Sequence, residues 1–154
     1  MMKLSKKSEY ALRALSRLAA PGAPAQMSIQ EVASQEKIPK KFLEQVLLAL
    51  KNAGILRSSR GKAGGYSLQR PAREVTLGAI LRAVDGPVMP LPCMNESSPV
   101  TCPECPTREN CWLRAVMSEV HQEVATVMDR VNLTAICRRV AQSRRSLPTP
   151  MYHI

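Results

Sequence analysis

Aromatic residues make up only 3% of this 154-residue chain, so aliphatic side chains supply most of its 45% hydrophobic content. That balance favours a mainly helical protein, and the length allows one domain with a substantial core. Runs of 18 or more apolar residues are missing, which excludes a transmembrane helix. The N-terminal stretch also lacks the apolar segment and cleavage site of a signal peptide. We therefore expect a cytoplasmic protein with no membrane partner.

Sequence motifs for catalysis are missing as well. No G-x-x-x-x-G-K-[ST] motif occurs, and the glycine-rich residues 61–65 precede a strand pattern, which argues against a nucleotide-binding loop. No Ser/His/Asp combination and no pair of carboxylates indicates an active site. A thiol oxidoreductase using Cys102 and Cys105 is the weaker alternative, because such C-x-x-C pairs normally lie in a βαβ unit. We expect no enzymatic activity.

Positive charge, by contrast, is abundant and unevenly distributed. The formal net charge is +10; residues 1–71 hold 13 Lys and Arg against 4 Asp and Glu, and residues 72–154 hold 9 against 8. Such an excess on one half of a chain indicates a polyanionic partner, either nucleic acid or an anionic membrane surface, and of the two we expect nucleic acid. A merely solubilising charge, or an interaction module for an acidic protein, is the alternative.

Two helices are predicted before residue 37. Apolar residues recur at helical spacing over residues 5–20, and Pro21-Gly22 ends the pattern. Ser28 and Glu31 then have the S-x-x-E spacing of a capping box, which marks the start of a short second helix.

A third helix and a hairpin complete the pattern of a winged helix-turn-helix. Pro39 fits the first turn of the third helix, and Gly54 fits the position just past its end. Residues 55–71 then have the pattern of a strand, a glycine-rich turn and a second strand. We therefore predict a mainly α fold with a small β-hairpin wing.

Long polar side chains occupy the outer face of the third helix near its start, and basic residues occupy the tip of the hairpin. A recognition helix uses such residues to reach base edges and phosphates, and a wing contacts the backbone or the minor groove. A solvated surface is the alternative. The candidate DNA contacts are Ser28, Lys40, Lys41, Glu44, Gln45, Arg60 and Lys62.

The C-terminal half is predicted to carry a dimerisation helix. Thr76 fits the N-cap of a fourth helix, and a long helix follows from near Arg108, at about 25 residues well above the mean of about 12. Its apolar residues step by four and three, the a/d pattern by which a helix packs along a partner. Packing within one subunit is the alternative to a homodimer. The stripe consists of Leu113, Met117, Val120, Val124, Val127 and Val131.

The expected domain organisation follows from these segments. Residues 1–71 form a winged helix-turn-helix DNA-binding domain, and residues 72–141 hold a linker helix, a cysteine-rich sensor loop (93–111) and the dimerisation helix. A short helix begins near Thr134, and residues 142–154 form a flexible, proline-containing tail.

Four of the five cysteines lie between residues 93 and 111. Stable disulfides are rare in the cytoplasm, and thiolates are preferred ligands for iron–sulfur clusters and for zinc. Cys111 is expected in the first turn of the long helix, where the helix dipole favours a thiolate. Four-thiolate zinc sites usually have two C-x-x-C pairs, and this loop has one. The residues thus favour a cluster and leave structural zinc open.

Three segments resemble the IscR/NsrR/RirA/CymR (Rrf-two) family of bacterial winged-helix regulators. ILRSSRGKAGGYSL is similar to the family's R-G-x-x-G-G-Y-x-L wing, KLSKKSEYALRAL to its opening helix, and CPTRENCWLRAVM to its last two cluster cysteines and dimer helix. The resemblance covers residues 2 to about 141. It implies a homodimeric transcription regulator that binds a pseudo-palindromic site in double-stranded DNA. It also implies a [2Fe-2S] or [4Fe-4S] cluster that senses iron–sulfur supply, nitric oxide or redox state.

The resemblance further implies a set of ligands. Cys93, Cys105 and Cys111 match the three cluster cysteines of the family, whereas Cys102 is additional and its role stays open. Glu9 matches an acidic residue that the partner subunit contributes in some relatives. Its alternative role is that of a first-turn acid stabilised by the helix dipole.

Other relatives use a histidine three residues after the last cysteine, but Arg114 stands at that position, which disfavours this type of site. His121 is expected to be solvated, and Cys137 is expected to pack as a small hydrophobic residue. Members of the family without cysteines bind DNA without a cluster, so the cysteine motif carries the inference of a cofactor.

Overall fold

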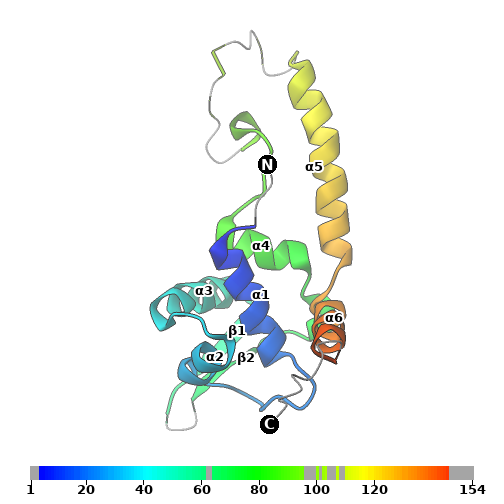
Figure 1. Cartoon of the computed structure of the whole chain (residues 1–154). Helices are drawn as coiled ribbons and strands as arrows, with labels where there is room; N and C mark the ends of the chain where they lie inside the picture. Colours follow the sequence, from blue (N-terminus) through cyan, green and yellow to red (C-terminus); the bar gives the residue numbers. More distant parts are fainter. Residues whose placement is uncertain are drawn as a thin grey trace, which may run out of the picture.

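The computed structural model describes residues 4–61, 64–95, 100, 102, 103, 107 and 110–145. Four helices and a hairpin form a headpiece, a long helix extends well beyond it along one side, and a last helix lies at its base (Figure 1). In chain order the elements are α1 (Lys6–Leu18), α2 (Ile29–Glu36), α3 (Lys40–Asn52), β1 (Leu56–Ser59), β2 (Gly65–Leu68), η1 (Ala72–Glu74), α4 (Leu77–Asp85), η2 (Pro92–Met94), α5 (Trp112–Arg130) and α6 (Leu133–Arg145).

Hydroxyl caps begin α2 and α4 at the predicted positions. The Ser28 hydroxyl accepts the Glu31 amide at 3.2 Å, and the Glu31 carboxylate accepts the Ser28 amide at 2.7 Å. This reciprocal pair confirms the predicted capping box. The Thr76 hydroxyl accepts the Ala79 amide at 3.1 Å, which confirms the predicted cap of α4.

Gly54 ends α3 as predicted. Its backbone is left-handed, with φ at 68°, a region that glycine enters without steric cost. The Gly54 amide therefore reaches the Lys51 carbonyl, and the Ile55 amide reaches the Leu50 carbonyl. This turn directs Ile55 into the core and aligns the chain for β1.

The hairpin is antiparallel, with Leu56 opposite Leu68 and Ser59 opposite Gly65. Its second strand also pairs with the segment before α2, because Met27 and Tyr66 exchange backbone hydrogen bonds of 3.0 and 2.8 Å. A Cβ atom on Gly65 would lie 2.5 Å from the Met27 carbonyl oxygen, so this pairing requires glycine there. The hairpin is thus fixed to the chain that enters α2.

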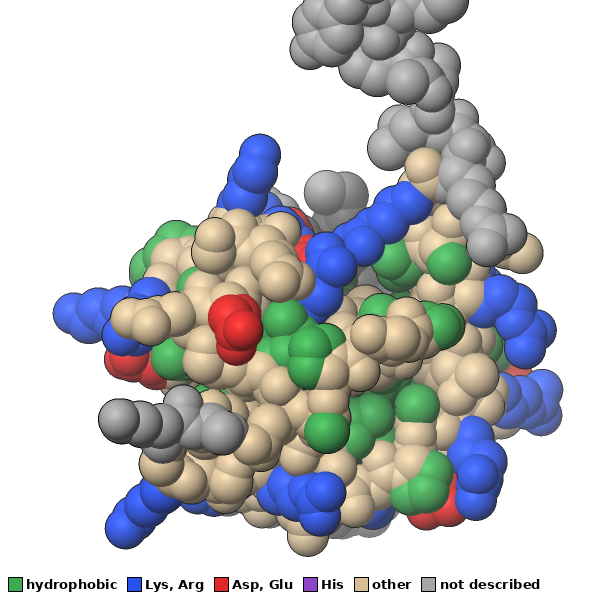
Figure 2. All heavy atoms as spheres, turned by 90° about the horizontal axis from the view of Figure 1, so that it is seen from below, with side chains coloured by type: hydrophobic (Ala, Val, Ile, Leu, Met, Phe, Trp, Pro, Cys, Tyr) green, Lys and Arg blue, Asp and Glu red, His purple; other side chains and the backbone are tan. Residues whose placement is uncertain are grey.

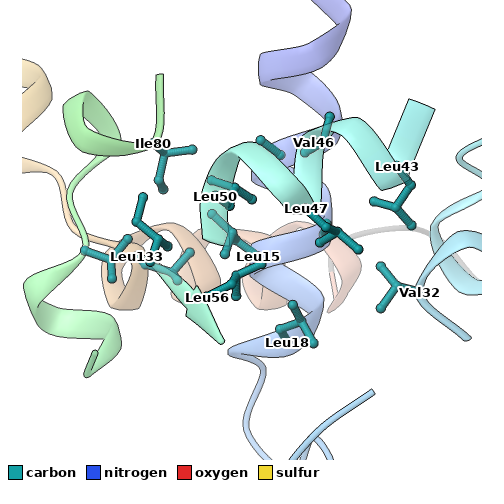
Figure 3. Packing of buried hydrophobic residues seen from close by; sticks show 14 of the residues in the cluster. Leu15, Leu18, Val32, Leu43, Val46, Leu47, Leu50, Leu56, Ile80 and Leu133 are labelled. Carbon is teal, nitrogen blue, oxygen red and sulfur yellow. The ribbon is translucent and has the colours of Figure 1, made fainter. Parts of the chain in front are cut away.

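Aliphatic side chains from almost every element of the headpiece meet in one core (Figure 3). α1 contributes Leu15, α3 contributes Leu47 and α4 contributes Ile80, and all three are fully buried. Leu133 of α6 is fully buried in the same cluster. The core therefore continues beyond residue 71 and includes the start of the last helix.

The long helix is shorter than the sequence pattern predicts. α5 has 19 residues and begins at Trp112, so Cys111 is its N-cap and not a residue of the first turn. The helix ends at Arg130 because Val131 is extended and its carbonyl accepts the Leu77 amide at 2.7 Å. Val131, expected as the last residue of the stripe, therefore lies outside α5.

The last helix, in turn, is longer than predicted. Asn132 starts it by accepting the Ala135 amide at 2.9 Å, and the helix continues to Arg145. Residues 142–145, which we expected in the tail, are helical, and the rest of that predicted tail lies outside the described residues. No helix in the described part of the chain has the length and apolarity needed to cross a membrane.

Candidate functional site

The outer face of α3 presents the predicted polar side chains to solvent. Lys40, Lys41, Glu44 and Gln45 are all exposed, while the apolar face of the helix is buried in the core. Pro39 occupies the N-cap and supplies no side-chain hydrogen bond. The first-turn amides and the two lysines consequently give this end of α3 a positive potential.

The hairpin extends this positive surface. Arg60 is exposed directly after β1, and Lys62 lies outside the described residues. Arg57 is also exposed and donates a hydrogen bond to the Ser67 hydroxyl at 3.0 Å. It is not among the predicted DNA contacts, although side chains alternate between the two faces of a strand and this alternation along β1 places Arg57 outward. Figure 2 shows this end of the molecule, with lysine and arginine side chains around its edge and few acidic ones among them.

Ser28 is already engaged within its own helix. Its hydroxyl oxygen accepts the Glu31 amide, so only the hydroxyl hydrogen is left to donate to a ligand. The hydrogen bonds from Ser28 hold the pKa of the Glu31 carboxyl below its usual value. This carboxylate repels phosphate, so Ser28 is a weaker candidate contact than the lysines of α3.

One face of α5 exposes large aliphatic side chains. None of the 19 residues of α5, all of which the structure describes, is buried. Val120 is 48% exposed and Val127 is 57% exposed. Burying one such side chain contributes about 1.5–3 kcal/mol, so this face is suited to packing against a second surface. The stripe residues on α5 are Leu113, Met117, Val120, Val124 and Val127.

The base of α5 is attached to α4 by polar contacts. Asp129 accepts hydrogen bonds from Arg82 at 2.7 Å and from Thr76 at 3.2 Å. The Arg82 guanidinium holds the pKa of Asp129 below its usual value. The backbone of Gly78 lies beside the same carboxylate, where a Cβ atom would collide with it. Glycine at this position therefore leaves room for the Asp129 carboxylate beside α4.

The cysteine loop joins α4 to α5. Cys93 is half-buried within η2, Cys111 is half-buried at the N-cap of α5, and Cys102 between them is exposed. Cys105 lies outside the described residues. Within the described ranges, no three His, Cys, Asp or Glu side chains lie close enough together to hold a metal ion.

Glu9 lies in the first turn of α1 and is partly exposed. Its carboxylate pairs with Lys6 at 2.6 Å and with Arg13 at 3.6 Å. The hydrogen bond from Lys6 is the main cause that holds the pKa of Glu9 below its usual value. Glu9 is thus an ionised carboxylate at the surface of the headpiece.

Cys137 and His121 were predicted to have no ligand role. Cys137 is buried in the core cluster, which confirms its predicted packing, and burial raises the pKa of its thiol. His121 is half-buried and lines a groove of about 420 Å³ between α5 and residues 88–90, so it is less solvated than predicted.

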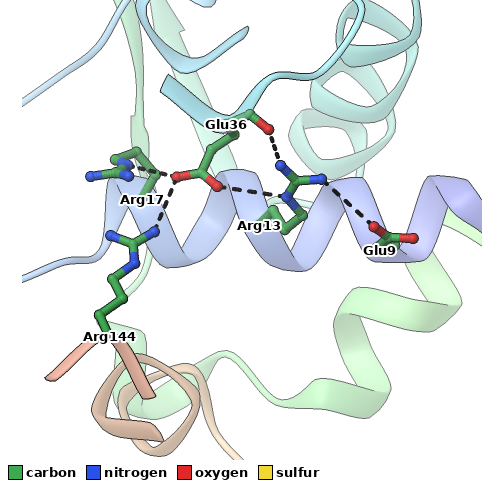
Figure 4. Close-up of polar contacts among 5 residues, drawn as sticks. All are labelled: Glu9, Arg13, Arg17, Glu36 and Arg144. Carbon is green, nitrogen blue, oxygen red and sulfur yellow. Dashed lines mark hydrogen bonds and ion pairs between the residues drawn. The ribbon is translucent and has the colours of Figure 1, made fainter. Parts of the chain in front are cut away.

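An ion cluster around one buried carboxylate, which no sequence pattern predicts, joins three helices (Figure 4). Glu36, at the end of α2, pairs with Arg17 of α1 at 2.7 Å and with Arg144 of α6 at 3.5 Å. Arg13 of α1 pairs with the same carboxylate at 3.6 Å and donates to the Glu36 carbonyl. The Glu36 side chain is only 8% exposed, so its charge depends on these arginines.

We expect Glu36→Ala to destabilise the protein by about 2 kcal/mol, because it leaves partly buried arginines without their shared counter-charge. Urea unfolding at fixed protein concentration measures this loss. Glu74→Ala is the matched control, since Glu74 forms an exposed pair with Arg73 and should cost well under 1 kcal/mol. Equal unfolding midpoints for the two variants would contradict a stabilising role for the cluster.

Comparisons with known proteins agree with this arrangement. The Rrf2 family model, described as an iron-dependent transcriptional regulator, matches residues 4–139. A Rhodobacter capsulatus protein named "Putative HTH-type transcriptional regulator rrf2-like" is 38% identical over 133 residues, which cover 84% of this chain and 89% of that one.

Solved structures of regulators share the fold. CymR, the global cysteine regulator of B. subtilis, has a TM-score of 0.68 at 29% identity and covers 90% of this chain and 98% of its own. The T. potens IscR structure has a TM-score of 0.66 at 24% identity over 99% of this chain and 97% of its own, and shows the likeness of fold. The winged-helix prediction is thus confirmed, and the names of the relatives indicate no enzyme. The chain belongs to the Rrf2 family of DNA-binding transcriptional regulators.

Proposed function

We propose that this protein is a cytoplasmic, homodimeric transcription regulator whose DNA binding is controlled by an iron–sulfur cluster in the loop of residues 93–111. The observation that carries the DNA-binding part is the exposed polar face of α3 beside the basic hairpin. Lys40 and Lys41 would reach phosphates and base edges from the start of α3, with Glu44 and Gln45 one turn further along. Arg60 and Lys62 would contact the DNA backbone or minor groove.

The α5 stripe supports a homodimer. Exposed aliphatic residues at a/d spacing pack best against an identical helix related by two-fold symmetry. Two headpieces held in this way would place their α3 helices on one face of a pseudo-palindromic site, about 34 Å apart or a multiple of that distance. The groove lined by Val120 and Val124 would receive side chains of the partner's α5.

The donor set of the loop suits an iron–sulfur cluster in its chemistry. Cys93 and Cys111 are anchored on helical elements at the two ends of the loop, and Cys111 lies at the positive end of the α5 dipole, which favours the thiolate. We propose Cys93, Cys105 and Cys111 as ligands, with Glu9 of the partner subunit as the fourth. When bound, such a group responds to oxidants, nitric oxide and iron supply.

Contacts that α4 makes with α5 and with α1 would carry the state of the loop to the DNA-binding face. Asp129 joins α5 to α4. Asp85, the last residue of α4, accepts hydrogen bonds from Ser5, the N-cap of α1, at 2.5 Å and from Ser8 of α1 at 2.6 Å. Ligation that orders the loop and the start of α5 would thus bias the placement of the headpieces.

The rival forms of this proposal are the same regulator with a structural zinc ion, or with no metal. Iron, sulfide and zinc contents per chain, measured without exposure to air, separate the three. A visible absorption spectrum supports a cluster, whereas zinc bound to thiolates gives none.

We expect Arg60→Ala and Lys40→Ala each to weaken DNA binding while the dimer stays intact. If each side chain contacts a phosphate, the slope of log affinity against log salt should shrink by about one unit per subunit. Fluorescence anisotropy on a selected duplex across a salt series measures both affinity and slope.

Lys7→Ala is the matched control for these variants. Lys7 is equally a surface lysine, but it lies in the first turn of α1, at the end of the headpiece remote from the hairpin (Figure 1). Its removal should leave the slope unchanged. Unaltered affinity and slope in both Arg60→Ala and Lys40→Ala would exclude the proposed docking.

A further inference from the structure

Leu48 is an exposed apolar residue in the middle of the polar face of α3. Its side chain is 55% exposed, although it lies between Leu47 and Leu50, both fully buried. It stands seven residues after Lys41, four after Glu44 and three after Gln45. Residues at the spacing i, i+3, i+4 and i+7 share one face of a helix, so Leu48 extends the row of candidate base contacts.

The position of Leu48 separates it from the core and from the α5 stripe. The core side of α3 is formed by its buried residues, and α3 lies on the side of the molecule away from α5 (Figure 1). Phe42 is exposed to the same degree, but six positions along a helix place it roughly 120° around the axis from Leu48. Leu48 is thus a single exposed apolar side chain within a polar, basic face, and it is not part of an apolar patch.

We propose that Leu48 contacts the 5-methyl group of a thymine in the major groove, and so selects thymine at one position of each half-site. The inference rests on the proposed docking of α3 in the groove. Thymine is the base that presents a methyl group there, and apolar side chains recognise it by contact. Lys41 at one end of the row would hold the phosphates that fix the register.

Replacing thymine by deoxyuridine tests this contact directly, because the two bases differ only in that methyl group. Duplexes are first selected from a random library by the wild-type protein. Each thymine of one half-site is then replaced singly, and the dissociation constant is measured at fixed salt for wild type and Leu48→Ala. We expect one replacement to weaken wild-type binding about fourfold, as removal of one buried methyl group would, and to leave Leu48→Ala unaffected.

Gln45→Ala provides the matched control on the same face. It should lower affinity for every duplex and still show the fourfold preference for thymine, because the methyl contact is intact. Leu48→Met should keep most of the preference, since the side chain stays apolar and long. Combining the substitution at residue 48 with the base replacement gives a thermodynamic cycle. This cycle separates the contact between the Leu48 side chain and the thymine methyl group from general effects on the helix.

The outcomes are distinct. Equal thymine preferences in wild type and Leu48→Ala, or no position that senses the methyl group, would overturn the assignment of Leu48 while duplex binding itself persists. A protein that selects no duplex above non-specific affinity would overturn the proposed function instead.

Discussion

Val124→Asp is expected to leave the protein monomeric at micromolar concentration. In the proposed dimer the substitution places two carboxylates opposite each other in the apolar seam of α5, at a cost of about 3 kcal/mol or more. That corresponds to at least a hundredfold weaker association. Sedimentation velocity of wild type and variant over a concentration series measures the change. DNA affinity should fall in parallel, because a monomer engages one half-site at a time.

Thr126→Asp is the control for this prediction. Thr126 is exposed on the same helix, two residues from Val124 and away from the stripe, so the same added charge should leave the dimer intact. Val124 lines one groove together with residues 88 and 89 of its own subunit, so a circular dichroism spectrum is needed to verify that the variant is folded. A folded Val124→Asp protein that still sediments as a dimer would show that the stripe packs within one subunit.

If the loop holds the proposed cluster, its cysteines are expected to differ in their effect on bound iron. Cys93→Ala, Cys105→Ala and Cys111→Ala should each lose most of it, because a cluster with an open corner is exposed to solvent and oxidation. Cys102→Ala should keep the cluster, in line with the greater exposure of Cys102. Iron and sulfide per chain, with the visible spectrum of anaerobically prepared protein, measure the difference.

Glu9→Ala completes this series. Loss of the proposed carboxylate ligand from the partner should give a more labile or spectrally altered cluster, whereas Lys6→Ala, which removes only the ion pair between Lys6 and Glu9, should not. Equal metal loss in all four cysteine variants, together with a silent Glu9→Ala, would instead indicate a four-thiolate site. Zinc and iron contents would then identify the metal.

Local signals predicted most elements of the fold. The capping box of Ser28 and Glu31, the left-handed Gly54 and the cap at Thr76 each depend on residues within one turn of each other. Such patterns are readable because the interacting groups are close in sequence. The exposed polar face of α3 was predicted in the same way, from the helical spacing of its apolar residues.

Contacts between distant parts of the chain could not be predicted from these patterns. Arg144 and Glu36 are 108 positions apart, and nothing local distinguishes this glutamate from an exposed one. The end of α5 also depends on a distant partner, since the extended Val131 hydrogen-bonds with Leu77 of α4. Periodicity indicates that a residue faces a partner, but not which partner it meets.

The core shared by the two ends of the chain has a consequence for synthesis of the protein. Leu133 and Cys137 fill the same cluster as Leu15 and Leu47, so a nascent chain that has reached residue 71 lacks part of the interior of its headpiece. Domains generally fold as units, so the headpiece completes its core only when these last residues are available. The surface presented by α3 is therefore fully supported only after the cysteine-rich loop and α5 have been translated, so synthesis of this loop always precedes a finished headpiece.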